Sequence, residues 1–239
     1  MSSAHILVER AIPMLSTIKE FKKLSLLDIE EVALVCHWYR FEKDEEIVTY
    51  HDVCNSVFFI VQGEVRVNYY SISGKEVILC DLPVGEIFGE LTAIDGRSRS
   101  ATVIAKTSSL VAAISSSDFQ MLIYNNQQIA AAILQRLTGQ IRRLTERVFE
   151  FSTLAVRNRI QAELLRLAKK QTTLSNNAII SPIPTHAELA NLVSTHREAV
   201  TRELNHLEKE QLILRKDHEL HILDMGKLTE MVENVRGNL

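Results

Sequence analysis

From residue 127 to residue 155 the sequence carries an apolar stripe whose members are spaced alternately four and three residues apart. They are Ala130, Leu134, Leu137, Ile141, Leu144, Val148, Phe151 and Ala155. This spacing is sustained for more than three heptads, so it predicts one long helix whose apolar edge packs against a partner helix. Ile129 and Ile133 form a neighbouring face that can pack on the helix's own domain. We therefore expect the stripe to join two copies of the chain as a homodimer; the alternative is that it packs only on its own domain.

The part of the chain before this helix has a different period. Between residues 40 and 115, short runs of β-branched and aromatic residues, such as 57–61 and 65–69, alternate with glycines. Runs of this length separated by turn residues predict a compact antiparallel roll or barrel. Residues 26–37 have one apolar face and predict a short helix ahead of it.

Two Thr-x-x-Glu segments, 185–188 and 195–198, follow the long helix. In such a capping box the Thr oxygen and the Glu carboxylate bond to free N–H groups at a helix start, so two helices are expected to begin ten residues apart. Their apolar residues face each other across a tight turn at 193–195, which is the spacing of a helix-turn-helix. Ser194 lies in this turn, where a left-handed conformation costs a non-glycine residue ~1 kcal/mol. Residues 213–222 predict a two-stranded wing.

The second of these helices has a polar face at its N-terminal end. Arginine pairs with guanine O6 and N7, and glutamate accepts from cytosine N4, so Arg197, Glu198 and Arg202 together are suited to read a G-rich half-site in a DNA major groove. As a bare pattern, the face fits a solvated surface helix equally well. The candidate DNA-binding residues are Thr185, Thr195, His196, Arg197, Glu198, Thr201 and Arg202.

The formal net charge of the chain is −3, but the acidic excess is confined to residues 1–125, and the remainder has more basic than acidic side chains. Attraction to phosphate depends on local clustering of charge, so an acidic domain joined to a mildly basic one is compatible with DNA binding. No apolar run is long enough to span a membrane. We expect a cytoplasmic protein without a membrane partner.

The chain gives no indication of a metal site or of catalysis. Cys36, Cys54 and Cys80 lack the spacing of zinc or iron–sulfur ligands, and we expect them to be buried free thiols in a reducing compartment. His218 and His221 have no third ligand nearby in the sequence. The chain also has no Gly-x-Ser-x-Gly elbow, Walker loop or zinc-protease helix, so we do not expect an enzyme.

The segment with the most specific chemistry lies at the end of the predicted roll. Residues 85–91 read Gly-Glu-Ile-Phe-Gly-Glu-Leu, and residues 99–103 read Arg-Ser-Ala-Thr-Val. A glycine lets the backbone approach a ligand, a carboxylate accepts from a ribose hydroxyl, and an arginine followed by small residues offers donors to a phosphate. Taken singly, these residues also fit a turn glycine and two surface charges.

As a set, FGEL with RSAT nine positions after its glutamate resembles the phosphate-binding cassette of cyclic-nucleotide-binding domains. The chain from about Phe21 to Asp224 resembles the cyclic-AMP receptor protein and FNR family. The resemblance implies an α+β fold with an antiparallel β-roll domain at 1–125, a dimerisation helix and hinge at 126–156, and a winged helix-turn-helix at 157–239. It also implies that Gly89 and Glu90 hold the ribose side of the ligand, and that Arg99, Ser100 and the Ala101 amide hold the cyclic phosphate.

In this family a Thr-Ser pair on the long helix contacts adenine, and the corresponding turn here offers Leu144 and Thr145. Only half of the pair is present, and helix register also brings Arg147 near the base. The candidate ligand-binding residues are Gly89, Glu90, Leu91, Arg99, Ser100, Ala101, Leu144 and Thr145. The expected effector is cyclic AMP, with cyclic GMP, a cyclic dinucleotide or no ligand as alternatives.

The resemblance thus predicts a ligand-responsive transcription regulator that binds an inverted repeat in double-stranded DNA. Its expected partners are a second copy of the chain, DNA and RNA polymerase.

Overall fold

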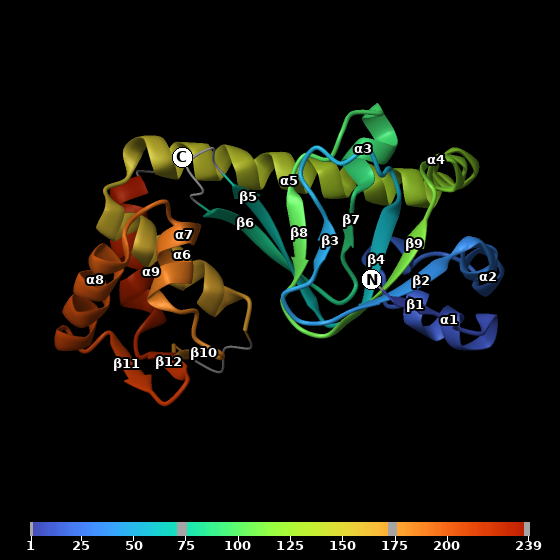
Figure 1. The fold of residues 1–239 in the computed structure, drawn as a ribbon. Coiled ribbons are helices and arrows are strands. Elements are labelled where there is room, and N and C mark those ends of the chain that lie inside the picture. Colours follow the sequence, from blue (N-terminus) through green and yellow to red (C-terminus); the bar gives the residue numbers. More distant parts are fainter. Residues whose placement is uncertain (1, 71–75, 172–175, 237–239) are drawn as a thin grey trace. The chain divides into compact units, whose positions relative to one another are not determined.

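The structure, a computed structural model, describes residues 2–70, 76–171 and 176–236 (Figure 1). The chain forms two compact units, Met1–Gln140 and Ile141–Leu239. Helix α5, Gln127–Thr153, is the long helix that the apolar stripe predicts, and it begins in the first unit and ends in the second. The first unit contains two antiparallel sheets together with helices, and the second is mainly helical, so the predicted α+β class is confirmed.

The first unit begins with β1 (Ser2–Ala4), α1 (Val8–Leu15), the 3-10 helix η1 (Lys19–Phe21) and α2 (Leu26–Val35). A capping box starts α2, because the Ser25 hydroxyl accepts from the Asp28 N–H and the Asp28 carboxylate accepts from the Ser25 N–H. The helix expected ahead of the roll is therefore present. It ends at Val35 because His37 already pairs in a strand.

The strands of the first unit form two sheets, with the orders β1-β2-β9-β4-β7 and β3-β8-β5-β6. Their bounds are β2 (His37–Phe41), β3 (Glu46–Val48), β4 (Val57–Gln62), β5 (Glu64–Tyr70), β6 (Glu76–Pro83), β7 (Ile87–Phe88), β8 (Thr102–Ala105) and β9 (Ser109–Ile114). Neighbouring strands run antiparallel throughout. The roll predicted from the short apolar runs is confirmed.

Strand β4 is apolar from Val57 to Val61 because both of its faces pack in cores. Side chains alternate between the two faces of a strand, so Val57 and Phe59 enter one core while Phe58 and Ile60 enter another. The first of these cores also contains Ile129 and Ile133 of α5. The beginning of α5 is thus anchored to the roll through a face separate from the apolar stripe.

The apolar stripe of α5 itself is largely exposed in the single chain. Leu134, Ile141, Leu144 and Val148 are between 62% and 65% exposed, whereas Leu137 packs partly against the first core. The stripe's last residue, Ala155, was predicted to continue the helix, and this is wrong because the backbone is extended there. An apolar helix edge of this length in water favours a partner helix.

The second unit contains α6 (Val156–Lys169), β10 (Ala178–Ile180), α7 (His186–Leu192), α8 (Arg197–Lys209), β11 (Ile213–Lys216), β12 (Glu219–Ile222) and α9 (Met225–Arg236). Helices α7 and α8 are the predicted helix-turn-helix, and β11 and β12 are the predicted wing. Strand β10 was not predicted, and it joins the wing in an antiparallel sheet of order β10-β12-β11. Among the helices of the described ranges, none combines the length and apolar character that crossing a bilayer requires.

Charged side chains join the end of α5 to α6 across the bend at residues 154–155. Arg166 Nη2 donates to both carboxylate oxygens of Glu150, at 2.8 and 2.9 Å, and Nη1 donates to Glu163. Arg147 Nη1 also donates to Glu163, at 2.8 Å. Burial alone would lower the pKa of Arg166, but the two carboxylates raise it. The bend is therefore held by two arginines of fixed charge and two largely buried carboxylates.

Candidate ligand and nucleic-acid sites

A left-handed glycine connects β7 to helix α3 (Glu90–Asp95) at the predicted ligand site. Gly89 has φ +85°, which side chains other than glycine rarely adopt. A Cβ atom there would lie 2.6 Å from Arg99 Nη1 and 2.8 Å from the Ser56 carbonyl oxygen. Both the turn and the close approach of Arg99 therefore require glycine at this position.

The Arg99 side chain is only 3% exposed and lies against this turn. Its Nη1 donates to the Gly89 carbonyl oxygen at 3.0 Å, and its Nη2 donates to the Ser56 carbonyl oxygen at 2.6 Å. Its Nε is buried and has no hydrogen-bond partner within the residues that the structure describes. A buried cationic donor with spare capacity is suited to an anionic oxygen such as that of a phosphate.

Glu90 follows the glycine and is 4% exposed. Its Oε1 accepts from Gln140 Nε2 on α5 at 3.2 Å and lies 3.9 Å from Arg136 Nε, also on α5. The structure thus brings together Gly89, Glu90 and Arg99, which were singled out in two separate segments of the sequence. A carboxylate held in this way can accept a hydrogen bond from a sugar hydroxyl.

The other candidate ligand residues lie around this turn or on α5. Leu91 is exposed on α3, Ser100 is exposed after Arg99, and Ala101 is buried just before β8. Leu144 and Thr145 lie on the part of α5 that belongs to the second unit, so their relation to the turn stays a prediction. The Thr145 hydroxyl donates to the Ile141 carbonyl oxygen of its own helix at 3.0 Å.

Arg136 is a charged residue near this site that was not found from the sequence. Its Nη1 bonds to Glu86 and lies 3.3 Å from Glu20 Oε1, and its Nη2 donates to the Ile87 carbonyl oxygen at 2.6 Å. Burial alone would lower the pKa of Arg136, but the hydrogen bond to Glu86 and the charges of Glu90 and Glu20 raise it. The one available signal was that Arg136 and Gln140 are four residues apart and share a helix face.

The other two acids around Arg136 behave differently from each other. Burial raises the pKa of Glu20 despite the opposing charge of Arg136. Burial acts in the same direction on Glu86, but its hydrogen bonds to Lys19 and Arg136 bring its pKa below the usual value. The ionised form of Glu86 is therefore favoured beside Arg136, whereas burial disfavours the ionised form of Glu20.

The three cysteines differ from the expectation of buried thiols. All are free, but Cys54 and Cys80 are exposed and Cys36 is half-buried, so the prediction is wrong for Cys54 and Cys80. Cys54 lies in the loop before β4, where its Sγ is 3.6 Å from Arg99 Nη2. Partial burial alone would raise the pKa of Cys54, but hydrogen bonds from Ser56 and Arg99 lower it. Burial raises the pKa of Cys36 to about 12.

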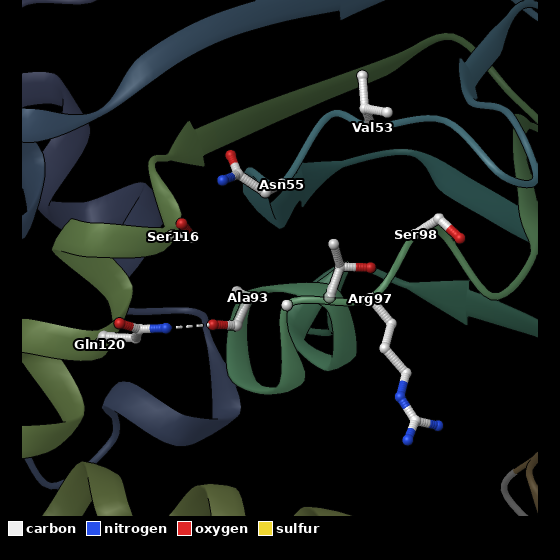
Figure 2. A pocket seen from close by; sticks show the side chains of 9 residues that line it. Val53, Asn55, Ala93, Arg97, Ser98, Ser116 and Gln120 are labelled. Carbon is white, nitrogen blue, oxygen red and sulfur yellow. Dashed lines mark hydrogen bonds between the residues drawn. The ribbon is translucent and has the colours of Figure 1, made fainter.

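A small cavity of about 220 Å³ lies between α3 and helix α4 (Ser116–Asn125) (Figure 2). In Figure 2 the Gln120 amide reaches the Ala93 carbonyl oxygen, at 2.6 Å, while Arg97 extends away from the cavity. Its lining includes neither Glu90 nor Arg99. Because ligand pockets usually occupy ~300–1,000 Å³, we assign this cavity no role.

The turn between α7 and α8 agrees with the sequence in part. The capping box of Thr185 and Glu188 is present. The second one, predicted for Thr195 and Glu198, is wrong, because His196 is the N-cap of α8 and the Thr195 N–H donates to the Ala190 carbonyl oxygen. Ser194 has φ +52°, the left-handed conformation considered for it.

Three residues of the predicted reading face are exposed at the start of α8: Arg197, Glu198 and Arg202. Thr201 instead lies 2.8 Å from His186 Nδ1, through its hydroxyl, so it joins α8 to α7. Burial lowers the pKa of His186, and the charges of Arg215 and Arg197 act in the same direction. A neutral imidazole is therefore favoured at this contact.

The buried side of α8 is fixed to α6. Gln161 Nε2 donates to Glu203 Oε1 at 2.6 Å, and both side chains are buried. In the wing, His221 Nε2 lies 3.1 Å from Glu219 Oε2. Within the described residues, no three histidine, cysteine or acidic side chains are grouped so that they could hold a metal ion.

Two family models match the chain. Residues 39–126 match the cyclic nucleotide-binding domain, and residues 158–231 match the Crp-like helix-turn-helix domain. The first range includes the turn at Gly89 together with Arg99. The second includes helices α7 and α8 and the wing.

Several regulators are similar to the chain along most of its length. It is 32% identical over 179 residues to the cAMP-activated global transcriptional regulator CRP of Salmonella typhimurium, covering 74% of this chain and 85% of that protein. It is 28% identical over 192 residues to the cAMP-activated regulator Vfr of Pseudomonas aeruginosa, covering 79% and 90%. The solved structure of CLP, a c-di-GMP-responsive global regulator of Xanthomonas campestris, has the same fold, with a TM-score of 0.72 and 21% identity over 83% of this chain and 99% of that one.

The surroundings of Cys54 predict its reactivity. Alkylation by iodoacetamide at neutral pH should be at least ~10-fold faster at Cys54 than at Cys36, because the thiolate is the reacting species. The rate at Cys54 should rise with a midpoint below the pKa of a free thiol, and Arg99→Ala should move that midpoint upward. Peptide mass spectrometry over a pH series measures this, and an unchanged midpoint in the variant would contradict the contact.

Proposed function

Because the chain belongs to the cyclic-AMP receptor protein and FNR family of transcription regulators, we propose that it binds cyclic AMP and then binds specific DNA as a homodimer. The surroundings of Arg99 are the main support for this proposal. Its guanidinium is buried against the Gly89 turn, and its Nε lacks a partner among the described residues. A cyclic phosphate would supply the missing anionic acceptor.

The neighbouring residues add the rest of the ligand contacts in this proposal. Ser100 and the Ala101 N–H follow Arg99 directly and offer neutral donors to the same phosphate. Glu90 would accept from the ribose 2'-hydroxyl, and Gly89 lets the backbone approach. Leu91 would give an apolar contact.

Cyclic AMP is favoured among possible effectors because CRP and Vfr are both named as cAMP-activated. The contact to the base is incomplete, since Leu144 offers no hydroxyl beside Thr145. Cyclic GMP and a cyclic dinucleotide are therefore the second candidates, and the c-di-GMP responsiveness named for CLP supports the dinucleotide.

Helix α8 would enter the major groove with its N-terminal end. Arg197 and Arg202 can pair with guanine, and Glu198 can accept from cytosine. Thr185, Thr195 and His196 lie at the starts of the two helices, where they can contact phosphates and fix the position on DNA. RNA polymerase is the expected partner of the DNA-bound protein.

The long helix α5 would connect the effector-binding domain to the DNA-binding domain. In this proposal residues 1–125 bind the effector, 126–156 form the dimer contact and hinge, and 157–239 read DNA. Arg166 and Glu150 join the end of α5 to α6, so a change in α5 would be passed to the reading unit through these charges. The effector would shift a pre-existing equilibrium toward the arrangement that DNA selects.

Isothermal titration calorimetry with cyclic AMP, cyclic GMP and cyclic dinucleotides tests the effector. We expect wild-type protein to bind cyclic AMP, and Arg99→Ala to weaken binding ~10–100-fold, because charge-assisted hydrogen bonds contribute roughly 1.5–3 kcal/mol. Arg97→Ala is the matched control, since its side chain is 86% exposed and two residues away. Equal affinity of wild type and Arg99→Ala would remove the assignment, and preference for a dinucleotide would replace cyclic AMP.

The dimer is tested by light scattering at micromolar concentration. Wild-type protein should have the mass of a dimer, and Leu144→Glu should give a monomer because a carboxylate would be buried in the apolar seam. Leu144 is preferable to Leu137 for this test, since Leu137 also packs on the core of the roll. Arg143→Glu places the same carboxylate on another face of α5 and should remain a dimer. A monomeric wild type would rule out the seam as the dimer contact.

Selection from random DNA in the presence of cyclic AMP tests the reading helix. A two-fold dimer should enrich an inverted repeat with half-sites about one DNA turn, roughly 34 Å, apart, and the family resemblance suggests half-sites like GTGA. Arg202→Ala should cost about 1–3 kcal/mol of specific affinity and relax preference at one guanine. Lys209→Ala, at the far end of α8, should leave the selected sequence unchanged. A non-palindromic motif would contradict the model.

A further inference from the structure

A buried acid in the N-terminal segment, ahead of α2, contacts the long helix. Glu20, in η1, is 7% exposed, and its Oε1 lies 3.3 Å from Arg136 Nη1. Arg136 also bonds to Glu86 and to the Ile87 carbonyl oxygen. The guanidinium is thus held by η1 and by the chain around the start of β7, both far from α5 in sequence.

Held in this way, the guanidinium points its remaining nitrogen toward Glu90. Arg136 Nε is buried, makes no hydrogen bond within the described residues, and lies 3.9 Å from Glu90 Oε1. Gln140, one helical turn later, donates to the same oxygen. Two side chains of α5 therefore set where this carboxylate lies, one by charge and one by a hydrogen bond.

We propose that Arg136 is a positioning residue of the effector site, which orients the Glu90 carboxylate toward a ribose 2'-hydroxyl, and that the N-terminal segment contributes to the site by holding Arg136 through Glu20. This inference rests on the proposed function, in which Glu90 accepts from that hydroxyl. A buried carboxylate without a counter-charge is costly, so the cation keeps Glu90 in a fixed place.

The alternative is that Arg136 only braces the fold. A brace would affect all ligands alike, whereas a positioning residue affects the hydrogen bond to one hydroxyl. The ratio of dissociation constants for 2'-deoxy cyclic AMP and cyclic AMP separates the two, because the ligands differ only in that hydroxyl. Weakened binding of both with an unchanged ratio indicates a brace.

Calorimetry of both ligands with the full-length chain measures this ratio. Wild-type protein should prefer cyclic AMP by about 10-fold or more, as expected for a hydrogen bond to a charged group. In Arg136→Lys, whose single ammonium cannot reach all of these acceptors, and in Gln140→Leu, the ratio should fall to about 3 or less. Glu20→Leu should give an intermediate ratio. Gln128→Leu, the same change at an exposed position of α5, should keep the wild-type ratio.

The outcomes separate the inference from the function on which it rests. If wild type discriminates and Arg136→Lys and Gln140→Leu keep its ratio, the positioning role is overturned and the proposed function stands. An unchanged ratio in Glu20→Leu alone overturns the part played by the N-terminal segment. Wild-type protein that binds neither ligand, or both equally, overturns the inference together with the role of Glu90. Should Arg136→Lys not fold, Arg136→Gln takes its place, and its ratio should fall in the same way because its side chain carries no charge.

Discussion

A guanidinium withdrawn from water cannot give up its proton, so it must find acceptors, and this constraint shapes three places on which the proposed function rests. Arg99 donates to backbone carbonyl oxygens and so fixes the turn at Gly89, in the proposed effector site. Arg136 takes carboxylates from the N-terminal segment and from the turn before β7. Arg166, partly buried, takes one carboxylate from α5 and one from α6. Arg99 and Arg136 join segments that are distant in the sequence, whereas Arg166 joins two consecutive helices.

Different faces of α5 make different contacts. Ile129 and Ile133 fix its beginning in the core of the roll, and Arg136 and Gln140 reach Glu90 in the proposed effector site. The apolar stripe is exposed in the single chain, and the proposal assigns it to a second copy. The last turns carry the charges that hold α6. One helix therefore contacts each part that the proposal connects: the effector site, the second copy and α6.

The parts of the fold that sequence predicted are those with a local period. Alternating short runs gave the roll, the heptad spacing gave α5, and a capping box gave the start of α7. Contacts between distant segments leave no such pattern, and Glu20 and Arg136 are 116 residues apart. The second capping box was wrong for a related reason: the Thr195 N–H is already bonded to Ala190, so α8 starts one residue later than the local pattern indicates.

Coupling between effector binding and DNA binding decides whether this chain is an effector-controlled regulator. The affinity of the full-length protein for its selected inverted repeat should be measured by fluorescence anisotropy at fixed salt, without and with saturating cyclic AMP. We predict that the nucleotide raises specific affinity by roughly 5–150-fold, the usual size of an allosteric coupling, and leaves binding to unrelated DNA nearly unchanged. Equal affinity for the repeat with and without the nucleotide would contradict the proposal that this chain is an effector-controlled regulator.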